Sequence, residues 1–331
     1  MTRRRRAPVT RIAITLPADF RGDEALAFHG RDPQALSERA GPEGIAKAVL
    51  LDGQAVCLTV RIGANVAEAE LVAASARNPR APDASATRAL VHRLLGLAQP
   101  VATFEHRFAD HPELGRLLRR RPGLRVPLAA TPFEALAWAI TGQQISVQAA
   151  VGIRRRLIER FGTPHPDGLV CHPVASQIAA LGVEDLRAVG YSRAKAEALL
   201  SVSQAASTGA LALGGWDEPP PPPQPPQPGA LTHAATTTPE TPSDARAETV
   251  RAALARIRGI GPWTIDYTLL RGFGWLDGSL HGDVAVRRAL RVLLGIDEID
   301  AAQTRDWLAP FSPWRALVAA HLWASLGDQG Y

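Results

Sequence analysis

The chain has 331 residues, of which 46% are hydrophobic, and this is enough for two or three domains with a sizeable core. Its net charge of +5 comes mostly from arginine, which suits phosphate contacts but is also common in proteins that bind no nucleic acid. The two cysteines, Cys57 and Cys171, form no CxxC pattern, so a four-cysteine zinc or iron–sulfur site is excluded. No apolar segment has the length of a membrane span, and the N-terminus lacks the apolar segment of a signal peptide, so we expect a cytoplasmic protein.

The first part of the chain has the pattern of a small α+β unit, which follows a basic arm at residues 1–10 that we expect to be disordered. Three segments have strand character: 12–16, 46–51 and 55–62. The last two flank Asp52 and Gly53, a pair typical of tight hairpins. Residues 11–86 are therefore predicted to form an N-terminal α+β domain with an antiparallel sheet.

From residue 87 to the C-terminus the apolar residues recur with the period of a helix. The predicted helices are 88–97, two between 133 and 161, 178–188, 192–207 and several after 245. Ser146 and Ser192 each precede one of them and are suited to cap it. We interpret residues 87–331 as one helical domain, which makes the chain an α+β protein.

A segment of different composition interrupts the helical domain at residues 216–244. It contains the sequences PPPPPQPPQPG and TTTPETPS, which cannot build an apolar core. We predict a disordered, proline-rich insertion that replaces a short loop.

Residues 254–290 carry the most specific pattern of the chain. Gly259 and Gly261 separate two apolar-periodic segments, so one helix ends there and the next begins within a few residues. Glycine lets the backbone approach a ligand closely, and the free N–H groups of the second helix suit a phosphate oxygen. Asp283 follows Trp263 by 20 residues and begins a further helix.

This segment resembles the helix–hairpin–helix and catalytic aspartate of the HhH-GPD superfamily of DNA base-excision glycosylases, and most closely the AlkA-type 3-methyladenine DNA glycosylases. Further blocks support the resemblance: RPGLRVP at 121–127, PFEA to GQQIS at 132–146, YSRAKA at 191–196, and PWR to HLW at 313–323. The resemblance implies a small N-terminal antiparallel-sheet unit followed by a two-lobed all-α HhH-GPD glycosylase core. It also implies a repair enzyme that flips an alkylated purine out of duplex DNA and hydrolyses its N-glycosidic bond.

Asp283 is the catalytic residue that the resemblance implies. Cleavage of an N-glycosidic bond builds oxocarbenium character on the sugar, and a nearby carboxylate can stabilise that charge and orient a water molecule. Asp is also a good helix N-cap, so a purely structural role is the alternative. The two roles are compatible.

Three aromatic residues match the base pocket of the family: Trp263, Tyr267 and Trp323. An electron-rich ring can stack on a flipped, cationic purine, although core packing is the more common role of aromatic residues in helices. Val284 departs from the pattern, because some AlkA-type enzymes have an aromatic residue there. Phe28 is a weaker match to a further aromatic residue of the pocket.

The remaining expectations concern contacts with DNA. Gln143 and Gln144 lie where the family places the wedge that fills the gap left by the flipped base, and structural loop glutamines are the alternative. Gly259 and Gly261 are expected to bind a DNA phosphate through their N–H groups, with a plain helix–helix turn as the alternative. No metal or organic cofactor is expected; a monovalent cation at the hairpin stays open.

The chain has no lysine after Lys195, whereas bifunctional relatives use a lysine in the helix after the hairpin to form a Schiff base. The resemblance therefore implies a monofunctional glycosylase without lyase activity, acting as a monomer on damaged double-stranded DNA. Two alternatives remain: a glycosylase of this superfamily for another lesion, and a non-catalytic helix–hairpin–helix DNA-binding protein.

Overall fold

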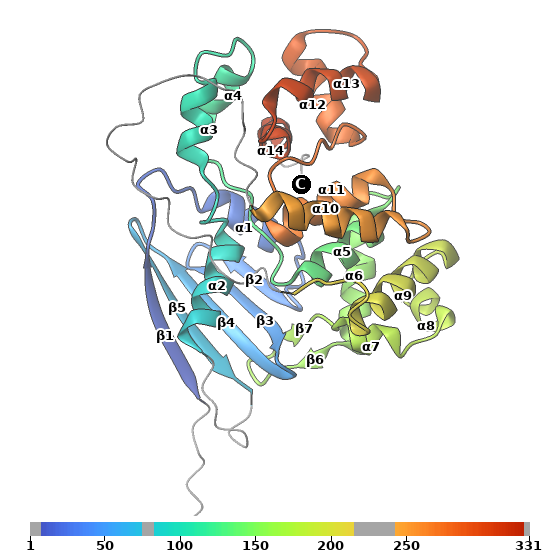
Figure 1. The fold of residues 1–331 in the computed structure, drawn as a ribbon. Helices are drawn as coiled ribbons and strands as arrows, with labels where there is room; N and C mark the ends of the chain where they lie inside the picture. Colours follow the sequence, from blue (N-terminus) through green and yellow to red (C-terminus); the bar gives the residue numbers. More distant parts are fainter. Residues whose placement is uncertain (1–7, 75–82, 215–241, 328–331) are drawn as a thin grey trace, which may run out of the picture.

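The computed structural model describes residues 8–74, 83–214 and 242–327. It begins with a five-stranded antiparallel sheet and continues as a helical body (Figure 1). The predicted α+β architecture is thereby confirmed. None of the helices that the structure describes is long and apolar enough to cross a membrane.

The sheet has the strand order β1-β5-β4-β3-β2. Its strands are β1 (Val9–Thr15), β2 (Glu38–Gly41), β3 (Gly44–Leu51), β4 (Gln54–Ile62) and β5 (Val66–Ala73). The predicted hairpin at Asp52 and Gly53 joins β3 to β4, and Asp52 and Gly53 both have the positive φ that such turns require. Val9 and Thr10, expected in the disordered arm, instead begin β1, because they pair with Val72 and Leu71 of β5.

Two helices accompany the sheet: α1 (Asp23–His29) and α2 (Ala84–Leu95). Leu90, Val91 and Leu94 of α2 are buried in the same apolar cluster as the strands. This helix was expected to be the first of the helical domain. It packs on the sheet instead, because its apolar stripe covers the inward side chains of β1 and β5.

The helical body has two apolar cores. The first is built by α5 (Pro132–Gly142), α6 (Val147–Phe161), α7 (Ala175–Ala179), α8 (Val183–Ala188), α9 (Arg193–Ser207), α10 (Pro242–Ala255) and α11 (Pro262–Phe273). The second is built by α3 (Val101–Phe108), α4 (Leu114–Arg120), α12 (Val284–Leu294), α13 (Ala301–Leu308), η1 (Ala309–Phe311) and α14 (Arg315–Ser325).

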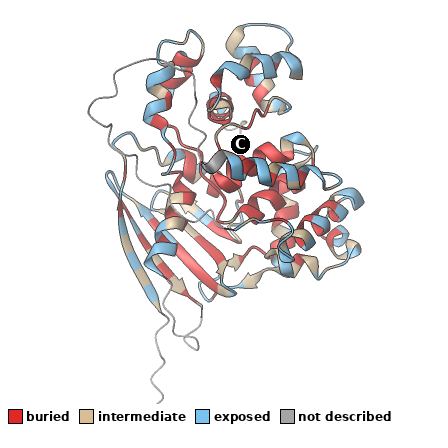
Figure 2. Ribbon diagram, viewed as in Figure 1, coloured by how far each residue is buried: buried red, intermediate tan, exposed pale blue. Residues whose placement is uncertain are grey.

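Helices α5 and α11 lie between the two cores and contribute to both. On α11, Leu269 belongs to the first core and Leu270 to the second. On α5, Ala137 belongs to the first core and Trp138 to the second. Both helices are buried over most of their length (Figure 2). The two lobes predicted for the helical body therefore share a common centre.

Several local expectations need correction. Residues 178–188 were predicted as one helix but form the end of α7 and all of α8, because Gly182 begins a new helix there. A short hairpin of β6 (Thr163–Pro164) and β7 (Val170–Cys171) was not predicted. Residues 216–241 of the predicted insertion lie outside the described residues, as does most of the predicted arm, and residues 242–244 begin α10 rather than continue the insertion.

A buried network of charges joins the sheet to the helical body. Lys47 of β3 donates to Glu38 of β2 at 2.7 Å and to Glu134 of α5 at 2.8 Å. Arg154 of α6 donates to Glu134 at 2.6 Å and lies 3.2 Å from Glu38. Because these buried charges compensate one another, the sheet, α5 and α6 are held in one arrangement.

Candidate active site

Asp283 is the N-cap of α12. Its Oδ1 accepts hydrogen bonds from the backbone N–H groups of Ala285 at 2.8 Å and Val286 at 2.9 Å. These are two of the N–H groups that a helix cannot satisfy in its own first turn. The capping role considered from the sequence is therefore present, and it fixes the position of the carboxylate.

Two indole groups also donate to this carboxylate. Trp263 Nε1 of α11 donates to Oδ2 at 2.7 Å, and Trp323 Nε1 of α14 donates to Oδ1 at 3.2 Å. Oδ1 thus accepts three hydrogen bonds and Oδ2 accepts one. A carboxylate has about four acceptor positions in all, so the oxygen left for a further partner is Oδ2.

The three predicted pocket residues lie together as a continuous wall beside Asp283. The ring centroids of Trp263 and Tyr267 are 5.2 Å apart with planes at 31°, and those of Tyr267 and Trp323 are 6.3 Å apart at 54°. Tyr267 and Trp323 are buried, whereas Trp263 is half-buried. A base sandwiched between two rings needs them about 7 Å apart, so a base would stack against the wall and not between its rings.

The hairpin between α10 and α11 has the backbone conformation that its glycines predict. Gly259 has φ +87°, and a Cβ there would lie 3.1 Å from the Cβ of Ala198 on α9. Gly261 is the N-cap of α11 and has no side chain to satisfy the first N–H groups of that helix. Nothing lies within 4 Å of a Cβ placed on Gly261. The beginning of α11 is therefore an open position for an anion.

The two predicted wedge residues lie in different environments. Gln143 Nε2 donates to the carbonyl of Gly259 at 3.0 Å and to Thr264 Oγ1 at 2.9 Å, so its side chain is held against the hairpin. Gln144 is exposed and has φ +56°, a strained conformation for a residue other than glycine. Of the two, Gln144 is the residue that can reach outward from the loop between α5 and α6.

The sequence did not indicate which residues support the aromatic wall from behind. Phe28 of α1 is buried, and the guanidinium of Arg271 lies 4.3 Å from its ring and 5.7 Å from that of Trp323. Phe28, whose sequence match to the pocket is weak, is thus separated from Trp323 of the wall by the guanidinium of Arg271. No spacing rule links α1 to α11, because the contact depends on how the sheet packs on the helices.

The segment before Asp283 is fixed by a bidentate ion pair. Arg315 donates to the two oxygens of Asp277 at 2.7 and 3.0 Å, and Ser312 also donates to this carboxylate at 2.9 Å. Arg315 belongs to the PWR block that supported the resemblance. Its contact joins the start of α14 to the connection between α11 and α12, and so aligns Trp323 with Asp283.

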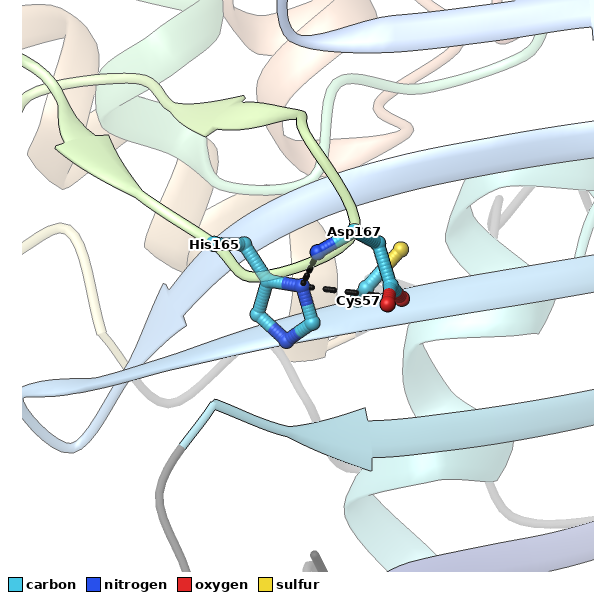
Figure 3. A group of neighbouring side chains, drawn as sticks. All are labelled: Cys57, His165 and Asp167. Atoms are coloured by element: carbon cyan, nitrogen blue, oxygen red, sulfur yellow. Dashed lines mark hydrogen bonds and ion pairs between the residues drawn. The ribbon is translucent and has the colours of Figure 1, made fainter.

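One group of side chains with metal-binding chemistry occurs within the described ranges: Cys57, His165 and Asp167, whose ligand atoms lie within 4.8 Å of one another (Figure 3). His165 Nδ1 accepts from the Asp167 N–H at 3.2 Å, and Nε2 lies 3.2 Å from the carbonyl of Val72. Burial and the hydrogen bond to Asp167 raise the pKa of Cys57 to about 12. The protein satisfies these groups itself, and they lie on β4 and the β6–β7 turn rather than beside Asp283. Both cysteines are buried, in keeping with structural roles.

Comparison with known proteins relates this chain to DNA repair proteins. Residues 137–311 match a family described as HhH-GPD superfamily base excision DNA repair protein. The chain is 29% identical over 218 residues to DNA-3-methyladenine glycosylase 2 of Escherichia coli (strain K12), a match that covers 65% of each protein. It is 28% identical over 250 residues to a Mycobacterium tuberculosis protein named probable bifunctional transcriptional activator/DNA repair enzyme AlkA, covering 74% of this chain and 43% of that protein. The chain therefore spans less than two thirds of the length of these relatives.

Solved structures share the fold over nearly the whole chain. A 3-methyladenine DNA-glycosylase from Archaeoglobus fulgidus superposes with a TM-score of 0.73 at 22% identity, covering 96% of this chain and 98% of that one. An 8-oxoguanine glycosylase/lyase from Clostridium acetobutylicum superposes with a TM-score of 0.65 at 12% identity, covering 96% and 98%. One fold thus occurs in proteins named for different lesions, so the fold alone does not identify the base.

Proposed function

Since this chain belongs to the HhH-GPD superfamily of base excision DNA repair proteins, we propose that it is a monofunctional DNA glycosylase that removes alkylated purines from duplex DNA. One observation carries the proposal. The Asp283 carboxylate is fixed by two backbone and two indole N–H groups at the edge of an aromatic wall. The name of the Escherichia coli relative supports 3-methyladenine and similar bases as substrates.

In the proposed reaction, Asp283 acts through Oδ2, which has a free acceptor position. Departure of the base leaves positive charge on the sugar, and the carboxylate stabilises that charge. Oδ2 can also accept a proton from the water that attacks C1′. The indole N–H of Trp263 fixes Oδ2 in place, so little reorganisation is needed as the charge develops. The products are a free base and an abasic site.

The wall of Trp263, Tyr267 and Trp323 provides the surface for the flipped base. Methylation at a ring nitrogen makes a purine cationic, and the face of an electron-rich ring attracts a cation. Trp263 is the half-buried member of the wall and would offer its face to the base. The same residue therefore serves both base stacking and the position of the carboxylate.

DNA is held by the hairpin and by the loop between α5 and α6. The N–H groups at Gly259 and Gly261 bind a phosphate at the beginning of α11. Gln144, exposed at the tip of its loop, fills the gap that the flipped base leaves and forms hydrogen bonds with the orphan base. In this proposal Gln143 is a positioning residue that ties the loop to the hairpin.

The proposed hydrolysis uses water rather than a lysine. Lys195 is the last lysine of the chain, and its Nζ donates to the carbonyl of Thr141 at 2.9 Å. We further propose that the protein acts on double-stranded DNA as a monomer and needs no metal or organic cofactor.

The experiment that tests the proposed function compares the wild type with Asp283→Asn on methylated duplex DNA. Asn keeps the N-cap but has no charge, so release of methylpurine should fall at least about a hundredfold. Strand breaks should appear only after alkali, as expected for a glycosylase without lyase activity. Asp306→Asn, which changes an exposed carboxylate, is the control and should act like the wild type.

The other outcomes distinguish the alternatives. Strand breaks without alkali would contradict a monofunctional reaction. Tight binding to DNA without base release from any methylated substrate would contradict the alkyl-base function. Two interpretations would then remain: a glycosylase for another lesion, or a non-catalytic DNA-binding protein.

A further inference from the structure

A thiol, an imidazole and a carboxylate converge where the sheet meets the short β6–β7 hairpin (Figure 3). Cys57 lies on β4, whereas His165 and Asp167 lie on the turn that joins β6 to β7. One potential ligand atom from each residue lies within 4.8 Å of the other two. Cys57 and His165 are buried and Asp167 is exposed, so solvent reaches the group from the side of Asp167.

The turn between β6 and β7 fixes the spacing of two of these groups. The N–H of Gly168 donates to the carbonyl of His165 at 3.0 Å, and Gly168 has φ +85°, which glycine adopts without strain. Arg39 of β2 donates to the backbone carbonyl of Asp167 at 2.9 Å and so holds the turn against the sheet. This contact uses the carbonyl and leaves the carboxylate to face the thiol and the imidazole.

The hydrogen bonds of His165 determine which ring nitrogen carries the proton. The N–H of Asp167 donates to Nδ1 at 3.2 Å, so Nδ1 is an acceptor. Nε2 lies 3.2 Å from the carbonyl of Val72, which can only accept, so Nε2 carries the proton. Histidines that bind metals commonly donate the second ring N–H to a backbone carbonyl, which fixes the tautomer. His165 thus has the tautomer and the outer contact of a metal ligand that binds through Nδ1.

The positions of the acceptor atoms match the geometry of a zinc site. His165 Nδ1 lies 3.6 Å from Asp167 Oδ2, and neither atom carries a proton that could join them. In a tetrahedral zinc site the ligand atoms are about 3.3–3.6 Å apart, because the metal–ligand bonds are about 2.0–2.3 Å long. Nδ1 and Oδ2 therefore already have the spacing of two zinc ligands. The thiol of Cys57, which hydrogen-bonds with Asp167, provides a third ligand atom.

We propose that Cys57, His165 and Asp167 bind a zinc ion, with a water molecule as the fourth ligand on the exposed side. Thiolate and imidazole ligands favour Zn²⁺ over Mg²⁺ and Ca²⁺, which prefer sets of oxygen ligands. On binding, the thiol releases its proton to solvent and the sulfur bonds to the metal. The ion also replaces the Asp167 N–H at Nδ1, and this N–H, on an exposed turn, then bonds to water. The thiolate and the carboxylate balance the two positive charges of the ion.

The role of this zinc ion is structural, and the inference goes beyond the proposed glycosylase reaction. The ion ties β4 of the sheet to the hairpin that follows α6 of the helical body. Its ligands lie on other elements than Asp283 and the aromatic wall. Because the unfolded chain does not hold the three ligands together, zinc binds the folded protein preferentially and stabilises it.

The first test titrates the full chain with Co²⁺, which substitutes for zinc and gives a charge-transfer absorption band when a thiolate binds it. The wild type should develop this band up to a one-to-one ratio, and added Zn²⁺ should abolish it. Cys57→Ala should lack the band. Cys171→Ala is the matched control and should keep the band, because Cys171 is buried in the same apolar cluster but is not a ligand.

Asp167→Asn provides a variant that leaves the core intact, since its side chain is exposed and similar in shape to Asn. It should weaken Co²⁺ binding at least about tenfold, because even the loss of an outer contact of a metal site weakens binding about 10–100-fold. Asp110→Asn, on the exposed turn after α3, is its control and should bind Co²⁺ like the wild type. An unchanged affinity in Asp167→Asn, or an equal band in Cys57→Ala, would refute the inference.

The second test measures thermal unfolding with and without Zn²⁺. Excess Zn²⁺ should raise the Tm of the wild type and of Cys171→Ala by a few degrees, because it binds only the folded state. The Tm values of Cys57→Ala and Asp167→Asn should not change. An equal rise in all four proteins, or no rise in the wild type, would overturn the inference. None of these readouts uses base release, so they test the zinc site separately from the proposed function.

Discussion

At the scale of single residues, the position of one carboxylate depends on donors from distant parts of the chain. Asp283 receives hydrogen bonds from residues 20 and 40 positions away, Trp263 and Trp323. Two indole N–H groups on one carboxylate fix its orientation more strictly than the helix cap alone. The aromatic residues are therefore expected to act on catalysis through the carboxylate as well as through base stacking.

Substitution Trp263→Phe tests this dual role, because Phe keeps an aromatic face but removes the indole N–H that binds Oδ2. We expect kcat for methylpurine release to fall on the order of tenfold, since one charge-assisted hydrogen bond is lost, while KM changes little. Trp307→Phe is the control, because Trp307 packs against Phe311 in the same lobe. A rise in KM with kcat unchanged would mean that Trp263 serves only in stacking.

The sequence predicted the local structure around the candidate site better than it predicted the contacts between its residues. Asp283 and the two hairpin glycines could be located from spacing, because the turn and the cap are local features of the chain. The contact of Trp323 with Asp283 could not, since it requires α14 to pack beside α12. Gln143 and Gln144 are identical in type and adjacent in sequence, and only the backbone shows which one is held against the hairpin.

At the scale of elements, the hairpin depends on a glycine that no other residue can replace without strain. Gly259 combines a φ of +87° with close contact to α9. Sequence patterns revealed this turn because glycine pairs are strong local signals. They did not reveal the break between α7 and α8 or the short β6–β7 hairpin, where the signals are weak and packing decides.

Gly259→Ala should destabilise the protein by about 1–2 kcal/mol and weaken DNA binding, because the hairpin must shift away from Ala198. Gly209→Ala is a matched control, since Gly209 also has a positive φ, of +80°, but no atom lies near its added Cβ. Both variants should lose stability in urea unfolding. Only Gly259→Ala should lose affinity for duplex DNA in a fluorescence anisotropy titration, and an equal loss in both would contradict a DNA-binding role of the hairpin.

At the scale of the whole molecule, buried titratable groups make stability depend on pH. The positive charges of Lys47 and Arg154 outweigh burial and lower the pKa of Glu134 to about 2 and that of Glu38 well below its usual range. Burial lowers the pKa of His172 to about 4 and that of His321 to about 3. All four groups bind protons more weakly in the folded state than in the unfolded state, so their effects have the same sign.

Stability should therefore decrease as the pH falls. These two histidines, together with His29 and His92, whose pKa values burial also lowers, act first, below pH 6.5. In that range the unfolded chain binds protons that the folded chain does not. The loss is about 1.4 kcal/mol per pH unit for each such proton. The two glutamates add to it between pH 4.5 and about 2. Urea unfolding at pH 7, 6 and 5 measures the slope.

The variant His172→Gln checks the assignment of this slope. It should make the loss between pH 6 and 5 smaller, because one of the histidines whose pKa is lowered by burial is gone. An exposed histidine, His106, provides the control in His106→Gln, whose slope should match the wild type. A stability that does not change between pH 7 and 5 would contradict the burial of neutral histidines.

Helices α5 and α11 each serve the cores of both lobes, and this has a mechanical consequence. A hinge between the lobes would have to break packing that is common to both, so the protein is expected to meet its substrate as a stiff template. The DNA, rather than the protein, must then deform when the complex forms. Bending and unstacking cost least at pyrimidine–purine steps and at mispaired or damaged positions. The same lesion should therefore be removed faster from pliable surroundings than from stiff A-tracts, so that the elasticity of the DNA takes part in choosing where repair begins.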